Sequence, residues 1–136
     1  MKADFEEIEH TADWALRIRG GDLRELLVNA GRGLSSLLVS EPDNIPTRVG
    51  ERFEIEADDA ESLLVQWLSE LAYWAEMEGI VFSKFELSHV SPTQLRAFVQ
   101  GDHVPNLKKH IKAVTYHNLE IVKSDTGLEA TVVFDV

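Results

Sequence analysis

The chain has 136 residues, enough for one domain, residues 1–136, that buries about two-thirds of its unfolded surface without disulfide bonds. Its 24 acidic and 13 basic residues give a net charge of −11, which opposes the phosphate attraction behind direct nucleic-acid binding, so we expect no strong binding of that kind. The absence of cysteine excludes disulfides and thiolate metal sites, and the lack of a membrane-length apolar run or a basic-then-apolar leader favours a soluble, cytoplasmic protein with no membrane partner.

The first part of the chain predicts two short strands and a helix. Apolar residues alternate loosely over residues 4–10 and cleanly over residues 14–19, as in strands with two different faces. Asp22 is a good helix N-cap, and the apolar residues after it recur at the spacing of one helical face up to about Val39.

A second helix gives the strongest periodic signal. It follows a strand at residues 52–57 with one wet face, and Asp58 or Asp59 offers its N-cap. Its apolar face consists of Leu63, Leu64, Trp67, Leu68, Leu71, Trp74 and Ala75. We therefore expect this helix to anchor the core, with the two tryptophans packing there rather than stacking on a cofactor.

The rest of the chain reads as strands. We expect them at residues 80–90, 94–100, 111–123 and 128–136, with a loop or single turn over residues 101–110 and a hairpin turn over residues 124–127. Two helices separated by strands and followed by a run of strands indicate an α+β fold. Its sheet should be mostly antiparallel, with the two main helices packed on one face.

Three segments contain polar or charged residues that a buried strand would not need. They are residues 10–13, residues 111–117 and residues 134–136. The middle segment mixes apolar residues with the polar side chains of Lys112, Thr115, Tyr116 and His117. Buried donors of this kind need partners, so the segment either borders a site or satisfies them with hydrogen bonds. Our interpretation is that the three segments form one acidic pocket that holds a metal ion.

Carboxylates suggest what kind of metal. Asp135 adjoins the terminal carboxylate of Val136, and Asp13 lies where one predicted strand follows another. Three converging carboxylates would repel one another unless a cation binds, and hard divalent cations prefer such oxygen ligands. The alternative is that Asp135 lies on the wet face of an edge strand beside a frayed chain end.

Other chemistries have weaker support. His10 and His117 with Asp13 would suit zinc, but the sequence has no His-x-x-x-His pair or cysteine, and single histidines near strand ends are usually structural. Lys112 either contacts an anion or is solvated. No phosphate loop, serine elbow or nucleophilic cysteine is present, so we expect no stand-alone enzyme.

Together these motifs resemble the archease family. The resemblance rests on His10-Thr11-Ala12-Asp13, on the helix pattern from Leu63 to Leu71, on Ile111 to His117, and on Phe134-Asp135-Val136. It spans almost the whole chain, and the order and spacing of the four motifs make it specific. One departure is His110, where the family usually has an acidic residue after a longer loop.

The resemblance implies a protein cofactor of the RtcB-type RNA ligase, which acts in tRNA splicing and RNA repair. Such a cofactor promotes guanylation of the ligase and its multiple turnover. By this likeness Asp13, Asp135 and Val136 correspond to ligands of a divalent metal ion (calcium, magnesium or manganese), and Lys112 to a functionally important lysine. We expect Lys112, His117 and His10 to contact the partner.

Charge is consistent with such a role. A ligase that handles RNA and guanosine triphosphate should have a basic cleft, toward which an acidic protein is steered. Two other functions remain open: a chaperone-like binding module that modulates the solubility or specificity of a tRNA-modifying enzyme, and a hydrolase that uses the same carboxylates on its own substrate.

Overall fold

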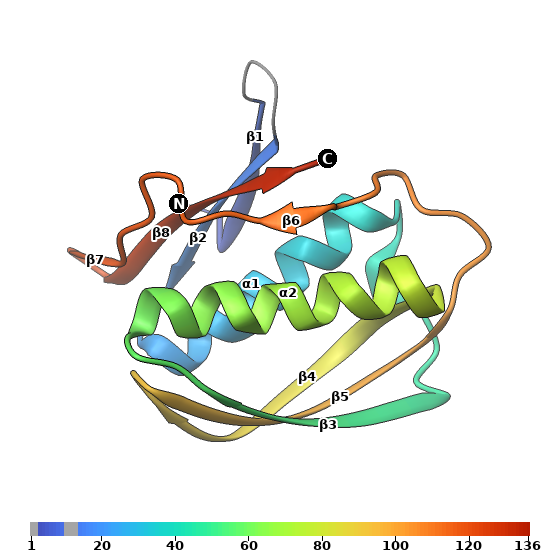
Figure 1. Ribbon diagram of the computed structural model, residues 1–136, viewed down its shortest axis with the longest axis horizontal. Helices are drawn as coiled ribbons and strands as arrows, with labels where there is room; N and C mark the ends of the chain where they lie inside the picture. The colour runs from blue at the N-terminus through green and yellow to red at the C-terminus, as the bar shows by residue number, and fades with distance from the viewer. Residues whose placement is uncertain (1–2, 10–13) are drawn as a thin grey trace.

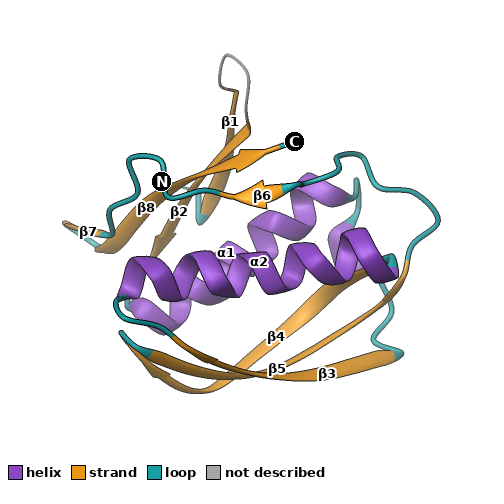
Figure 2. Cartoon of the chain, in the orientation of Figure 1, coloured by secondary structure: helices purple, strands orange, loops and turns teal. Residues whose placement is uncertain are grey.

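The structure is a computed structural model that describes residues 3–9 and 14–136. Within these ranges the chain folds into two antiparallel sheets with two long helices between them (Figures 1 and 2). The α+β class, the antiparallel pairing and the two main helices are confirmed. The strands divide into two sheets, and the helices cover one face of each.

The described part of the chain contains eleven elements. They are β1 (Phe5–Glu9), β2 (Trp14–Gly20), α1 (Leu23–Leu38), the 3₁₀ turn η1 (Pro42–Asn44), β3 (Val49–Glu56), α2 (Ala60–Glu78), β4 (Ile80–Ser91), β5 (Gln94–His103), β6 (Ala113–Val114), β7 (Val122–Ser124) and β8 (Gly127–Asp135). Sheet A has the order β1-β2-β8-β6, with β7 pairing β8 as well, and sheet B has the order β3-β5-β4.

Both helices begin at the caps that the sequence predicts. The Asp22 carboxylate accepts a hydrogen bond from the backbone N–H of Glu25 at 2.9 Å, and that of Asp59 accepts one from Ser62 at 2.7 Å. The bond from Ser62 also lowers the pKa of Asp59 below its ordinary value of 3.8, because it favours the charged carboxylate. Local side-chain chemistry thus fixes where each helix starts.

The core lies between the sheets and is centred on α2. Trp67 is fully buried, and its indole Nε1–H donates to the carbonyl of Leu27 on α1 at 2.8 Å. Phe53 of β3 meets Trp67 edge to face, with ring centroids 6.2 Å apart, and stacks on Trp74 at 6.4 Å. The prediction that both tryptophans serve packing is confirmed.

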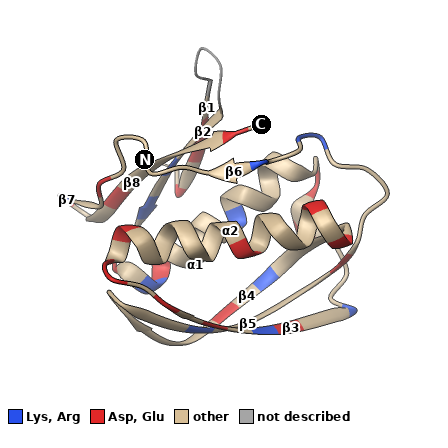
Figure 3. Ribbon diagram, in the orientation of Figure 1, with Lys and Arg blue, Asp and Glu red and all other residues tan. Residues whose placement is uncertain are grey.

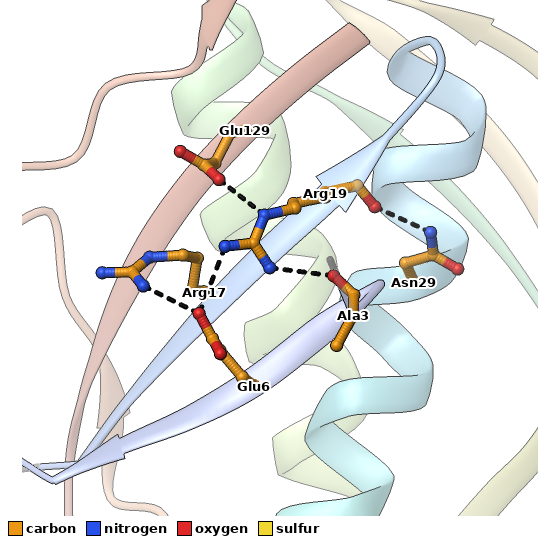
Figure 4. Close-up of polar contacts among 6 residues, drawn as sticks. All are labelled: Ala3, Glu6, Arg17, Arg19, Asn29 and Glu129. Atoms are coloured by element: carbon orange, nitrogen blue, oxygen red, sulfur yellow. Dashed lines mark hydrogen bonds and ion pairs between the residues drawn. The ribbon is translucent and has the colours of Figure 1, made fainter. Parts of the chain in front are cut away.

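An ionic cluster joins the strands of sheet A (Figure 4). Arg19 on β2 bonds Glu129 of β8 at 2.7 Å and Glu6 of β1 at 3.2 Å, and Arg17 bonds Glu6 at 2.7 Å. These bonds, that from Arg17 first, lower the pKa of Glu6 below its ordinary value of 4.5. The amide of Asn29 on α1 donates to the Arg19 carbonyl at 2.7 Å, which attaches the helix to the same sheet.

The strand predicted over residues 111–123 is wrong in its middle. Only its two ends, β6 and β7, pair with β8. Between them the Thr115 hydroxyl and backbone N–H both bond the Val133 carbonyl, at 2.9 and 3.0 Å, and a turn closes from the Leu119 N–H to the Tyr116 carbonyl. Thr115 thus satisfies both of its donors at the start of a turn instead of in a continuous strand.

The hairpin turn predicted at residues 124–127 is confirmed between β7 and β8. The strand predicted to end at Gln100 continues as β5 to His103. No helix among residues 3–9 and 14–136 is long and apolar enough to cross a membrane.

Candidate functional site

Two of the three segments that the sequence singled out meet at the end of β8 (Figure 1). Ala113 of β6 pairs with Asp135, and Val114 pairs with Phe134. The backbone N–H of Lys112 also donates to the carbonyl of Asp135 at 2.7 Å. Residues 20 or more positions apart in the sequence therefore form one continuous piece of sheet A.

The carboxylate of Asp135 faces water. Its neighbour Phe134 is fully buried, so the alternation of the strand directs Asp135 to the outward face, where it is exposed. The alternative of an edge strand does not hold, because β8 lies between β2 and β6. Val136 is half-buried and packs against the core, which restrains the chain beside the aspartate.

The third segment, residues 10–13, lies outside the described residues, and so do its candidate ligands His10 and Asp13. Trp14, which follows Asp13 in the sequence, pairs with Phe134, so the described chain reaches the same end of sheet A. In the described ranges no three His, Cys, Asp or Glu side chains are grouped to hold a metal. A metal site at Asp13, Asp135 and Val136 stays a prediction.

Lys112 lines a groove that does not include Asp135. The exposed Lys112 borders this groove between β6 and α2, together with Glu76 and with Ala113, the register partner of Asp135. The backbone N–H of Lys112 bonds the carbonyl of Asp135, so the groove lies next to the Asp135 end of sheet A.

His117 lies in the turn that follows β6. It is exposed, its backbone N–H donates to the Thr115 hydroxyl at 3.3 Å, and its ring Nε2 is 3.3 Å from the amide nitrogen of Asn118. Asn118 has a positive φ of 50°, a conformation that asparagine tolerates better than most residues. The zinc alternative combines His117 with His10 and Asp13, both outside the described residues, so it also stays open.

Lys109 is a residue that sequence reasoning missed. Its ammonium lies 3.8 Å from the ring centroid of Trp14 and 3.2 Å from the carboxylate of Glu7, and only 15% of its side chain is exposed. It fastens the loop before Lys112 to β1 and β2. One signal is readable in the sequence, a basic residue three positions before Lys112 in an acidic chain.

The same loop is also fastened to α2. The Nδ1 of His110 lies 3.0 Å and 3.3 Å from the two carboxylate oxygens of Glu76. This is the position where the sequence departs from the archease pattern, and here the histidine contacts an acidic residue of the helix. Both side chains are exposed, so the contact contributes little stability by itself.

Comparison with known proteins identifies the family. Residues 5–136 match the model of the archease protein family (MTH1598/TM1083). The chain belongs to the archease family. It is 33% identical to protein archease of Methanosarcina acetivorans, over 97% of this chain and 95% of that protein. It is 32% identical to protein archease of Methanopyrus kandleri, over 97% and 99% of the two chains.

Solved structures of archease relatives agree with the fold. Protein 1598 of Methanobacterium thermoautotrophicum, solved in solution, superposes with a TM-score of 0.79 at 28% identity, covering 98% of this chain and 99% of that one. An archease and possible chaperone from Thermotoga maritima superposes with a TM-score of 0.65 at 23% identity, covering 96% of each chain. At that identity the second likeness bears on the fold alone.

Proposed function

We propose that this archease-family chain is a metal-binding protein cofactor of an RtcB-type RNA ligase in tRNA splicing and RNA repair. It promotes guanylation of the ligase and multiple turnover, and does not act as a stand-alone enzyme. Family membership over residues 5–136 supports this proposal. So does the pairing of β6 with the end of β8, which brings the Lys112 segment to Asp135.

The donor set fits a divalent cation. Asp135 offers an exposed carboxylate that makes no ion pair with any other residue in the described ranges, and Val136 adds a main-chain oxygen as a second donor. Asp13 supplies the third. Oxygen ligands of this type suit calcium, magnesium or manganese. When bound, the ion would offset phosphate charge that develops during nucleotidyl transfer.

The residues of the site have different roles in this proposal. Asp13, Asp135 and Val136 hold the cation, and Lys112, which lines the groove beside α2, contacts a phosphate or an acidic residue of the ligase. The net charge of −11 steers the protein toward a basic ligase cleft. His117, in the turn that follows β6, and His10 add partner contacts.

The experiment measures transfer of labelled GMP onto a purified RtcB-type ligase, with the chain at substoichiometric concentration. Calcium, magnesium, manganese and a chelator are compared. We expect the wild-type chain to raise guanylation and turnover, and Asp13→Asn, Asp135→Asn and Lys112→Met each to reduce the stimulation at least tenfold. Glu86→Gln, on sheet B, is the matched control and should stimulate as the wild type does.

The rival functions give different results. A chaperone-like module would protect a tRNA-modifying enzyme from aggregation only at stoichiometric amounts and without a metal. A hydrolase would act without the ligase. If Asp13→Asn and Asp135→Asn fold normally, fail to bind the ion and still stimulate guanylation fully, the metal role is wrong.

A further inference from the structure

The groove between α2 and β6 has an apolar floor and exposed apolar walls. Six of its lining residues are Ala72, Tyr73 and Met77 from α2 and Ile111, Ala113 and Val114 from the β6 segment. It encloses about 420 Å³. Tyr73 is 54% exposed and Met77 is 65% exposed. Because they are four residues apart on one helix, their side chains are neighbours on its surface. Large apolar side chains held in water along a groove indicate a contact surface.

The surroundings of the groove are acidic. Helix α2 carries Glu61, Glu70, Glu76 and Glu78 and no lysine or arginine, and Figure 3 shows it with acidic segments only. Its C-terminal end also carries the negative end of the helix dipole. A second hollow lies on the other side of Tyr73, and Glu56 and Glu70 line it. No Lys or Arg among the described residues lines this hollow.

Strand β6 forms the side of the groove opposite α2. This two-residue strand is the last in its sheet among the described residues, and it lies alongside α2 (Figure 1). Lys112, the residue immediately before β6, is the only basic residue among the described residues that line the groove. A bound segment therefore meets an apolar centre, one basic side chain at the β6 rim and several carboxylates along α2.

We infer that this groove docks a short basic segment of a protein partner, with one or two large apolar side chains inserted between Tyr73, Met77 and the β6 segment. Lys or Arg residues flanking those anchors lie against Glu70 and Glu76. Charge complementarity selects this occupant, because an acidic segment or a second copy of a chain of charge −11 would be repelled.

This docking surface rests on the proposed function only in taking the partner to be a protein. It does not depend on a metal ion, since neither Asp135 nor Val136 lines the groove. Docking through the groove and activation through the carboxylates are therefore separable properties. The groove determines the affinity for the partner, and the carboxylates determine the stimulation of the bound partner.

The test uses fluorescence anisotropy with three labelled 14-residue peptides. The first has two Phe residues, three apart, flanked by Lys and Arg. The second has Ser in place of each Phe, and the third has Glu in place of each basic residue. We expect only the first to bind the wild-type chain with micromolar affinity, and its binding to weaken with rising salt.

Variants locate the binding. Tyr73→Ala with Met77→Ala should weaken binding of the first peptide at least tenfold, and Glu70→Gln with Glu76→Gln about threefold to tenfold with a smaller salt dependence. Val122→Ala, another exposed large apolar residue, should change it less than twofold. Circular dichroism checks that each variant is folded, since both groove positions are exposed and tolerate truncation.

Three results would overturn the inference: equal binding to the wild type and the Tyr73→Ala/Met77→Ala variant, equal binding of the acidic peptide, or self-association of the wild type that Met77→Ala abolishes. The ligase assay separates the two proposals. Loss of the groove should raise the concentration for half-maximal stimulation and leave the plateau intact, whereas Asp135→Asn should lower the plateau. If the ligase shows no response at all, the peptide measurements still decide the docking inference.

Discussion

The stabilising contacts of Lys109 with Trp14 and Glu7 can be tested by replacing Lys109 with methionine. Lys109→Met keeps the length and apolar stem of the side chain but removes the ammonium that contacts Trp14 and Glu7. Because Lys109 fastens the loop that leads into Lys112, the loss should loosen the candidate site as well as the fold. We expect a lower free energy of unfolding and faster hydrogen exchange at the amides of residues 106–112.

The magnitude follows from the two contacts. An ammonium over a tryptophan face in a mostly buried position contributes about 1 kcal/mol. The ion pair with Glu7, whose side chain is 39% exposed, adds about 0.5 kcal/mol after solvent screening. The methionine retains the packing of the stem, so we expect a total loss of about 1.5 kcal/mol.

Urea denaturation of four proteins measures this loss. They are the wild type, Lys109→Met, Trp14→Leu and the double variant, and their double-mutant cycle isolates the contact between ammonium and ring. We expect a coupling free energy of about 1 kcal/mol, and a Lys109→Arg control that retains most of the stability. A coupling below about 0.3 kcal/mol would refute the cation–π assignment.

Three further predictions concern the metal, the core and the helix cap. Calcium at 100 times its dissociation constant should raise the free energy of unfolding by about 2.7 kcal/mol, a gain that Asp135→Asn should abolish in thermal melts. Trp67→Phe should cost about 2 kcal/mol in urea melts, because it opens a void and removes the bond to the Leu27 carbonyl, and a loss below about 0.5 kcal/mol would contradict this. The pKa of Asp59 is lowered by its bond from Ser62, so its stabilisation is complete above the ordinary value of 3.8 and disappears as pH falls through the lower folded value. Asp59→Ala should therefore destabilise the protein in urea melts at pH 7 and have little effect near pH 2.

The helices could be predicted because their signals are local. The caps Asp22 and Asp59 bond the backbone within three residues, and the apolar period of α2 around Trp67 reports directly on what the helix buries. The division of the strands into two sheets could not be predicted. It depends on pairings such as β2 with β8, between segments more than 100 residues apart, for which the alternation of side chains gives no partner.

The candidate site was predictable in part for the same reason. The concentration of polar groups from Lys112 to His117 indicated a special segment, and the structure brings its start to Asp135. The sequence did not show that Lys112 also borders a groove beside α2, because that depends on how β6 packs against the helix. Tyr73 and Met77 had a readable signal: they fall off the apolar face defined by the tryptophans, yet they are large and apolar.

The position of β8 inside sheet A has a consequence during synthesis. Strands β2, β6 and β7 all pair with it, so none of them has its main partner until residues 127–135 have left the ribosome. Sheet B is complete by His103, and α1 and α2 precede that point. We expect the nascent chain to assemble the helices against sheet B first and to gain the Asp135 end of sheet A as its last folding step.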